Sequence, residues 1–403
     1  MKILLYGVGG QFRQYFYDEE FLKNVIQDIK IEIVGVCDGN KQLWGNEVFI
    51  GKKKFLIQDI STVNKKRWDN IVVTSKEYYE VIKKELINGG CEKDSILRID
   101  EFVGKALFDG DYKYKLSLVL MIRNEGEYIQ EWIEYHRLVG VEHFYIYDNQ
   151  STDHLKEILF GYITKGIVTY LFWKGGQAEA YNHALSHYKL ESKYMGFNDT
   201  DEFIIPLAGN NIFDVIEDLF RYDRERFLPK LYPKESVPGG IGIGWRIYGT
   251  SDHKTKPEGL VIENYKYRAN EPIQEACFLK TIANPRTVVV CDIHCMHYLK
   301  GYECISENGS SLPSGIFFDS HFEKIRINHY WSRSEEELYQ KICRGSGCGP
   351  YHRDIKEEEK MTENLYERFK ERLMRVRKYF NAEYDYIMEK YIEDVKTAIS
   401  QHK

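Results

Sequence analysis

Short apolar runs alternate with amphipathic helical segments in two successive series along this chain. The runs of the first series have the length of buried strands and comprise residues 2–6, 31–37, 71–74 and 96–99. A helix is expected after the first run, from the helical spacing of Phe12, Tyr15, Phe16, Leu22, Val25 and Ile26. Such alternation predicts parallel strands, so residues 1–106 are expected to form a small Rossmann-like α/β domain.

A glycine-rich turn, residues 7–12, joins the first predicted strand to this helix. It is similar to a dinucleotide-binding turn, and Asp38 ends the next strand, where a ribose-binding acid is usual. Phe12, however, stands where close packing of helix on strand normally requires glycine. A tight turn with no ligand explains the segment equally well, so no nucleotide is assigned to the first domain.

The second series begins after a charged, glycine-bearing connection, residues 103–113, which predicts a domain boundary. Strands are expected at residues 116–122, 143–147 and 167–173, with helices at 127–138 and 178–188. This second α/β domain is expected to span residues 114–350. Residues 351–403 are expected to be a helical segment, from the helical spacing of Leu365, Phe369, Leu373, Val376 and Phe380.

Two aspartates, Asp199 and Asp201, follow a short apolar run that begins at Tyr194. Residues two apart in an extended backbone point the same way, so both carboxylates can face one divalent ion. Mg²⁺ and Mn²⁺ take one or two carboxylates and complete their shell with water and phosphate oxygens. The pair therefore suits a substrate that carries a diphosphate.

Charge and composition exclude several classes of partner. The net charge is −6, from 56 basic and 62 acidic residues, which argues against a nucleic-acid partner. The first residues lack the pattern of a signal peptide, so a cytoplasmic location is expected. The eight cysteines are too sparse for a disulfide scaffold and are expected to be reduced and mostly buried.

A series of spaced motifs in the second domain resembles glycosyltransferase family 92 and its relatives in family 2. The motifs are Arg123-Asn-Glu125, Glu131-Trp-Ile-Glu-Tyr-His136, Gly140-Val-Glu-His-Phe-Tyr145, Asp148-Asn-Gln-Ser-Thr-Asp153, Gln177-Ala-Glu-Ala-Tyr-Asn182, Asp199-Thr-Asp-Glu-Phe203, Trp245-Arg-Ile-Tyr-Gly-Thr-Ser-Asp-His253, Pro257-Glu-Gly-Leu-Val-Ile-Glu-Asn-Tyr265, Lys280-Thr-Ile, Asn328-His-Tyr330 and Arg344-Gly345. They cover residues 115–346. The resemblance implies a GT-A fold, a UDP-sugar donor and a glycan acceptor.

The resemblance also implies roles for individual residues. Substrate binding is expected at Arg123, Asn124, Glu125, Asp148, Asn149, Gln177, Asn182 and Asp199. An Mn²⁺ or Mg²⁺ ion is expected on Asp199, Asp201 and His329, since two aspartates leave the ion short of protein ligands. His294 and His297 are alternatives to His329. For the catalytic base the prediction is Asp252, with His253 and Glu263 open as alternatives, because an inverting transfer needs a base near the acceptor hydroxyl.

The expected function is therefore metal-dependent, inverting transfer of a hexose or N-acetylhexosamine to a glycan hydroxyl, in surface or capsular polysaccharide synthesis. A sugar-nucleotidyltransferase and a non-catalytic nucleotide-sugar-binding module are the alternatives. A lipid-linked acceptor at the inner face of the membrane is one possibility. Peripheral membrane contact would then use the C-terminal basic residues Lys370, Arg372, Arg375, Arg377 and Lys378.

Two further patterns are discounted. Cys291, His294, Cys295 and His297 are soft metal ligands, yet no second cluster with the spacing of a zinc site accompanies them. The glycine-rich segment 234–244 lacks the Lys-Ser/Thr ending of a phosphate-binding loop, and a flexible loop near the acceptor is expected there.

Overall fold

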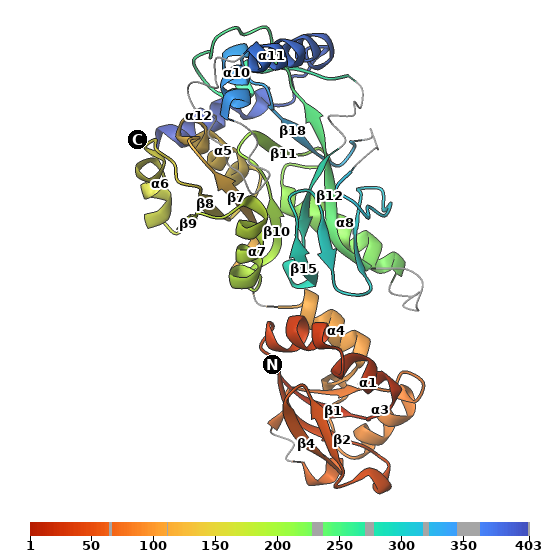
Figure 1. The fold of residues 1–403 in the computed structure, drawn as a ribbon. Helices are drawn as coiled ribbons and strands as arrows, with labels where there is room; N and C mark the ends of the chain where they lie inside the picture. The colour runs from red at the N-terminus through yellow and green to blue at the C-terminus, as the bar shows by residue number, and fades with distance from the viewer. Residues whose placement is uncertain are drawn as a thin grey trace. The chain divides into compact units, whose positions relative to one another are not determined.

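The computed structural model describes residues 1–63, 67–110, 112–227, 237–270, 278–316, 322–344 and 363–401. The chain divides into two compact units, Met1–Asp111 and Tyr112–Lys403 (Figure 1). The expected α/β class is confirmed in both units. Each unit has its own sheet and its own apolar core.

The first unit is built on a six-stranded sheet with the order β3-β4-β2-β1-β5-β6. Its strands β1 (Lys2–Tyr6), β2 (Glu32–Cys37), β4 (Lys53–Gln58), β5 (Asn70–Val73) and β6 (Ile96–Arg98) are parallel. Gly7 follows β1 with φ +99°, and a Cβ there would lie 2.9 Å from Thr74 Oγ1. Asp38 Oδ2 accepts a hydrogen bond from the Val8 N–H at 3.0 Å, so this carboxylate holds the glycine turn itself.

Three details of the first unit differ from the sequence prediction. The expected single helix is divided at Asp18, whose side chain accepts from the Phe21 N–H, into α1 (Gly10–Phe16) and α2 (Glu19–Phe21). An antiparallel edge strand, β3 (Glu47–Ile50), pairs with β4. The expected connection is largely helical, since α4 spans Ile99–Phe108 and buries Leu107 and Phe108. Apolar residues on one face of α4 outweigh its single glycine.

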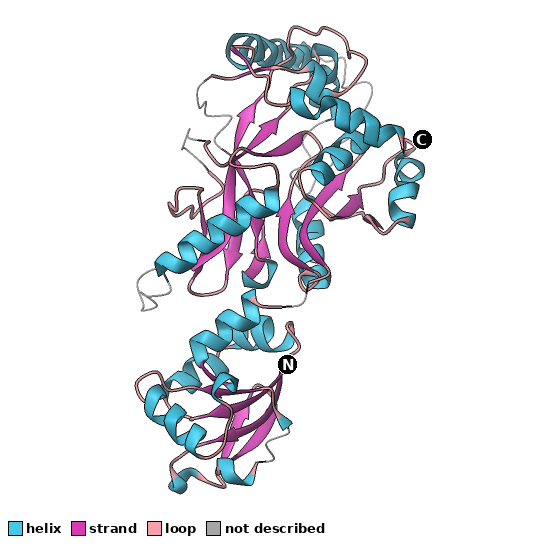
Figure 2. Cartoon of the chain, turned by 180° about the vertical axis from the view of Figure 1, so that it is seen from behind, coloured by secondary structure: helices cyan, strands magenta, loops and turns pink. Residues whose placement is uncertain are grey.

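The second unit is built on a nine-stranded mixed sheet, with eight strands in the order β11-β18-β12-β14-β10-β7-β8-β9 and β17 (Tyr302–Ile305) beside β12. Four strands are parallel: β7 (Tyr114–Ile122), β8 (His143–Asp148), β9 (Val168–Phe172) and β10 (Ser192–Phe197). Helices α5 (Gly126–Leu138), α6 (Leu155–Thr164) and α7 (Gln177–Tyr188) connect them (Figures 1 and 2). The carboxyl ends of parallel strands share one edge, so the predicted site residues after β7, β8 and β10 meet there.

An antiparallel pair brings a later segment to this edge. β11 (Glu202–Pro206) pairs with β18 (Ile325–His329) in a register that sets Glu202 opposite His329. The backbone N–H of Tyr330 donates to the Asp201 carbonyl at 2.8 Å. This pairing therefore fixes His329 next to the aspartate loop.

The glycine-rich segment is a strand and not the expected loop. β12 spans Val237–Ile247, and residues 234–236 lie outside the described part of the chain. A Cβ on Gly240 would lie 2.2 Å from the Tyr298 hydroxyl, and one on Gly242 would lie 2.6 Å from Leu312 Cδ1. Glycine is required here because neighbouring side chains cross the strand closely.

The C-terminal segment belongs to the second unit and is more than a helical tail. Helices α11 (Glu363–Arg375) and α12 (Ile392–Ser400) flank a short strand, β19 (Glu383–Tyr384), which pairs with β13 (Tyr267–Arg268). Helix α12 packs on α5, and the rings of Tyr135 and Tyr391 are 5.2 Å apart. Residues 351–362 of the expected helical segment lie outside the described residues.

Two other features bear on the sequence expectations. The six cysteines in the described residues, Cys37, Cys91, Cys291, Cys295, Cys304 and Cys343, are not joined in disulfides, and four of them are buried. The remaining two, Cys277 and Cys348, lie outside the described residues. A helix long and apolar enough to cross a bilayer does not occur in the described ranges.

Candidate active site

The loops after β7 and β8 are tied together by Asn124. Its side-chain oxygen accepts from the Thr152 N–H at 2.7 Å, and its own N–H donates to Ser151 Oγ at 3.0 Å. Asn124 has φ +54°, a left-handed conformation in which asparagine is more common than most residues. Arg123, the preceding residue, is half-buried. These contacts give two predicted substrate-binding loops a common framework.

Glu125 is buried and paired with an arginine from far along the chain. Arg333 Nη2 donates to Glu125 Oε2 at 3.0 Å, and the guanidinium lies 3.5 Å from the centre of the Tyr128 ring. Burial works to lower the pKa of Arg333, but the neighbouring groups, with Glu125 foremost, together raise the net pKa. The pair fixes the start of α5 to the segment after β18.

Asp148 and Asn149 lie at the end of β8 and are both buried. Asp148 Oδ1 accepts from the Ser151 N–H at 2.8 Å, and Oδ2 accepts from the Tyr170 hydroxyl at 2.5 Å. The Asn149 amide donates to the Gly175 carbonyl at 3.1 Å. Its Oδ1 has no hydrogen-bond partner among the described residues. This buried acceptor at the strand end is the feature that best fits recognition of a ring N–H.

Gln177 and Asn182, both on α7, have different contacts. Gln177 Nε2 donates to Asp199 Oδ1 at 2.6 Å and therefore reaches the aspartate loop. The Asn182 amide exchanges two hydrogen bonds with the backbone of Cys291, at 2.7 and 2.9 Å. Cys291 ends β15 (Val288–Cys291), so Asn182 ties α7 to this strand.

Asp199 is held by a buried lysine that the sequence did not single out. Lys280, on β14 (Leu279–Ala283), places Nζ 3.0 Å from Asp199 Oδ2 and 4.0 Å from Glu202 Oε1. Burial raises the pKa of Glu202 well above its usual value, although Lys280 opposes this. Burial also opposes protonation of Lys280, but Asp199 and Glu202 together raise its pKa well above the usual value. Asp199 is therefore the counter-ion of Lys280.

Asp201 has other partners. Lys341, on α10 (Glu335–Arg344), places Nζ 2.5 Å from Asp201 Oδ2, and His329 Nε2 lies 3.5 Å from the same oxygen. Burial alone would raise the pKa of Asp201, but Lys341 and His329 hold it well below its usual value. Burial lowers the pKa of His329, although Asp201 opposes the shift. An ionised carboxylate and a neutral imidazole thus face each other.

These two side chains fit a divalent ion. Carboxylate oxygen and neutral imidazole nitrogen both bind Mn²⁺, and His329 Nδ1 is buried without a partner among the described residues. A cluster of three or more histidine, cysteine or acidic side chains able to hold a metal does not occur in the described part of the chain. The protein therefore offers two ligands, and water and phosphate oxygens would supply the others.

The alternatives to His329 have different surroundings. His294 is half-buried, and its Nδ1 lies 3.2 Å from the Leu279 carbonyl. Burial, with the charge of Lys280, lowers the pKa of His294 to about 4. His297 is exposed. Of the three histidines, His329 is the one with a recorded ionic contact to Asp201.

The three candidate bases contact other parts of the second unit. Asp252 is exposed, has φ +63°, and accepts from the Asn381 amide at 3.3 Å. Glu263 pairs with Lys396 on α12 at 2.7 Å, and this hydrogen bond lowers its pKa. His253 Nε2 lies 3.2 Å from the Asn264 carbonyl. Asp252 and Glu263 thus border the C-terminal segment.

The family can now be identified. The model of glycosyltransferase family 92 matches residues 123–385, which is more than half of the chain. This chain belongs to glycosyltransferase family 92. The match confirms the resemblance of the spaced motifs. Residues 1–97 match a second model, described as C2185-like, N-terminal.

Curated relatives of this family 92 chain are distant. A glycosyltransferase family 92 protein of Ricinus communis is 23% identical over 245 residues, covering 58% of this chain and 39% of the relative. The beta-1,4-galactosyltransferase galt-1 of Caenorhabditis elegans is 27% identical over 162 residues, covering 36% of this chain and 35% of that protein. The chain thus spans about two fifths or less of the length of these relatives.

Two solved structures are similar to parts of the family 92 chain. S. aureus TarS 1-349 in complex with UDP has a TM-score of 0.32 and 14% identity, covering 57% of this chain and 63% of that one. Glucosyl-3-phosphoglycerate synthase from Mycobacterium tuberculosis, with Mn²⁺ and UDP, has a TM-score of 0.22 and 18% identity, covering 33% and 44%. Scores this low carry no argument about the site.

Four residues of the family 92 site were not predicted: Glu202, Lys280, Arg333 and Lys341. Glu202 directly follows the aspartate pair, and Lys280 lies in a motif of the family resemblance, so both had a local signal. Lys341 is 140 residues from Asp201 and no spacing connects the two. Its role becomes visible only in the folded chain.

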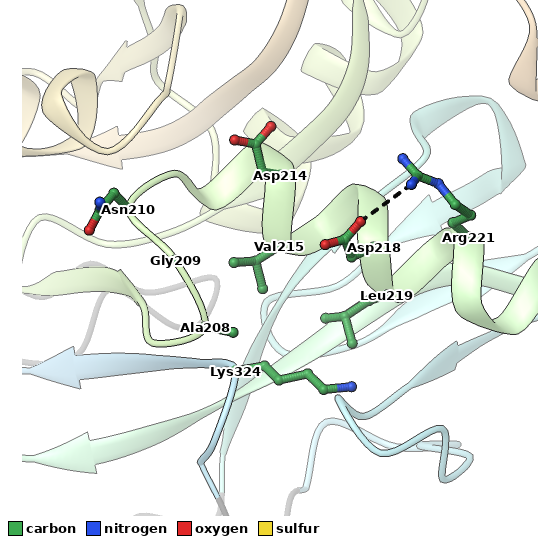
Figure 3. A pocket seen from close by; sticks show the side chains of 9 residues that line it. All are labelled: Ala208, Gly209, Asn210, Asp214, Val215, Asp218, Leu219, Arg221 and Lys324. Atoms are coloured by element: carbon green, nitrogen blue, oxygen red, sulfur yellow. Dashed lines mark ion pairs between the residues drawn. The ribbon is translucent and has the colours of Figure 1, made fainter.

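A cavity of about 420 Å³ lies at the other end of β11 (Figure 3). It is lined by Ala208, Gly209, Asn210, Asp214, Val215, Asp218, Leu219, Arg221 and Lys324. The five residues of β11 separate it from Asp201 by roughly 17 Å of strand. None of the predicted site residues lines this cavity.

Proposed function

We propose that this family 92 chain transfers a hexosyl or N-acetylhexosaminyl group from a UDP-sugar to a hydroxyl of a glycan acceptor, with inversion and with a divalent ion. One observation carries the proposal: Asp201 and His329 meet at 3.5 Å beside Asp199, at the carboxyl end of β10. Mn²⁺ or Mg²⁺ bound there would stabilise the charge that develops on the leaving diphosphate. Asn149 Oδ1 is assigned to the uracil ring.

The transfer forms one bond and breaks one. The acceptor oxygen attacks the anomeric carbon while the bond from that carbon to the UDP oxygen breaks, and UDP leaves with the electron pair. A base on the acceptor side takes the hydroxyl proton. Asp252 remains our proposal for this base, since it is exposed and lies in the loop after β12. Lys280 orients Asp199 by its contact at 3.0 Å.

The setting is also a proposal. We place the reaction in the cytoplasm, at the inner face of the membrane, with a lipid-linked glycan as acceptor in surface polysaccharide synthesis. Basic residues of the C-terminal segment have partners within the protein, among them Lys370, which pairs with Glu367. Arg377 pairs with Glu335, and Arg372 lies 5.3 Å from the centre of the Trp331 ring. Membrane contact would therefore use the remaining exposed faces of α11.

One assay separates this function from its alternatives. We expect Mn²⁺-dependent release of UDP from one member of a panel of UDP-sugars, and loss of that release in Asp201→Ala. Pyrophosphate release from UTP and a sugar phosphate would instead identify a nucleotidyltransferase. Binding of UDP without turnover of any donor and acceptor pair would identify a binding module.

A further inference from the structure

Lys341 contacts the carboxylate of Asp201, which we assign as a ligand of the divalent ion. Its Nζ is 2.5 Å from Asp201 Oδ2 and donates also to the Trp331 carbonyl at 3.1 Å. The Asp201 side chain is only 13% exposed. A carboxylate that is this buried is costly without a cation, and Lys341 supplies one in the metal-free protein.

The two lysines near the aspartate pair differ in how firmly they are held. The Lys280 side chain is 1% exposed and has two acidic neighbours, Asp199 and Glu202. The Lys341 side chain is 29% exposed, and its single ionic contact in the described residues is Asp201. An ammonium on a flexible four-carbon stem that is open to solvent can move without unfolding its surroundings. Lys280 is therefore a fixed counter-ion, and Lys341 is an exchangeable one.

We propose that Lys341 exchanges partners during donor binding: it holds Asp201 while the metal is absent, and passes to the diphosphate of the donor when the ion takes Asp201. This inference rests on the metal-dependent donor binding proposed above. It goes beyond that proposal because it assigns a lysine of α10 to the donor phosphates.

Charge explains why the exchange is directional. A divalent ion and an ammonium repel each other at one carboxylate, so binding of the ion weakens the contact of Lys341 with Asp201. A diphosphate brings negative charge and several acceptor oxygens to the same place. Charge-assisted hydrogen bonds from an ammonium to phosphate are stronger than neutral ones. Lys341 thus lowers the affinity of the site for the ion alone and raises its affinity for the ion together with UDP.

This linkage predicts effects of opposite sign in one variant. In Lys341→Met, Mn²⁺ binding without nucleotide should tighten about tenfold, because the competing ammonium is gone. UDP binding at saturating Mn²⁺ should weaken about tenfold, because a phosphate contact is lost. If Lys341 had a purely structural role, its replacement would weaken the binding of both Mn²⁺ and UDP. Mn²⁺ binding is measured from the electron paramagnetic resonance signal of the free ion, and UDP binding by calorimetry.

Controls make the outcome decisive. Lys300→Met removes an exposed lysine outside the site and should leave both affinities unchanged. Thermal unfolding checks that the Lys341→Met variant is folded. If it is not, the same measurements are made on Lys341→Gln. If the wild-type protein binds neither Mn²⁺ alone nor UDP in the presence of Mn²⁺, the proposed function fails. If it binds both, any result for the variant other than tighter Mn²⁺ and weaker UDP overturns the exchange.

Discussion

Lys280 and Asp199 form an ion pair in which the lysine is closed to solvent: Nζ lies 3.0 Å from Oδ2, and the lysine side chain is 1% exposed. The residues come from β14 and from the loop after β10, 81 positions apart. The pair therefore joins the loop after β10 to β14, its antiparallel neighbour in the sheet.

Lys280→Met should destabilise the second unit. The substitution removes the cation between Asp199, whose side chain is 34% exposed, and the buried side chain of Glu202, and such losses cost about 1–3 kcal/mol. Urea unfolding measures the change. Lys256→Met is the matched control, because its pair with Glu127 is 35% and 73% exposed and should contribute at most about 1 kcal/mol. Equal losses in the two variants would contradict the assignment.

Asp252→Asn tests the proposed base. The substitution keeps size and hydrogen bonding but removes basicity, so kcat should fall about a hundredfold or more with little change in UDP affinity. Asn381→Ala removes the hydrogen-bond partner of Asp252 but leaves its carboxylate in place. It therefore distinguishes the basicity of Asp252 from the position of its loop. A similar fall in kcat for both variants would mean that the loop matters and the carboxylate does not, and Glu263 would then be tested next.

Acid should destabilise the second unit through His136. This side chain is fully buried, its Nε2 accepts from the Ile204 N–H at 3.2 Å, and burial lowers its pKa to about 3. The unfolded chain binds the proton near pH 6.5, so this stability is present above that pH and is lost as the pH falls toward 3. Between pH 6.5 and 5 the loss should be about 2 kcal/mol.

The control for this pH dependence is a pair of variants. Between pH 6.5 and 5, the free energy of unfolding of His136→Gln should fall by about 2 kcal/mol less than that of wild type. Replacing the exposed His297 by glutamine should leave the pH dependence of unfolding as it is in wild type. Urea unfolding at several pH values gives the slopes. Parallel slopes for wild type and His136→Gln would show that another group is responsible.

Asp385→Asn should weaken the attachment of the C-terminal segment to the rest of the second unit. Asp385 is 9% exposed and pairs with Arg268 at 2.7 Å and Arg326 at 2.5 Å, so its neutralisation leaves the buried Arg326 without this anion and Arg268 with Glu383 alone. The expected loss is about 3–5 kcal/mol in urea unfolding. Glu383→Gln is the control, because this partner of Arg268 is 48% exposed and should contribute about 1 kcal/mol or less.

The second unit should fold and bind UDP without the first. A chain beginning at Asp111 keeps Tyr112, whose ring lies 4.2 Å from the Arg286 guanidinium, and should be soluble. A chain beginning at Val103 retains half of α4 and exposes Leu107 and Phe108, so it should aggregate. Gel filtration and UDP calorimetry compare the two. Failure of the shorter chain to bind UDP would mean that the first unit completes the pocket.

The sequence by itself determined the class of the fold and several of its elements. Apolar runs of strand length between amphipathic segments predicted the parallel strands β7, β8 and β10, because periodicity and burial are local properties of the chain. The shared carboxyl edge of parallel strands then predicted which loops would meet. The family motifs placed His329 with Asp201, and the structure sets the two 3.5 Å apart.

Only the tertiary structure decided which charges neutralise each other. Asp199 and Asp201 are two residues apart, yet they bind Lys280 and Lys341, from β14 and α10. The same holds for Asp385, which joins the C-terminal segment to Arg326, and for Gly240, whose strand could not pass Tyr298 with a side chain. These contacts depend on packing between segments that are distant in sequence, and no local preference of the chain encodes that packing.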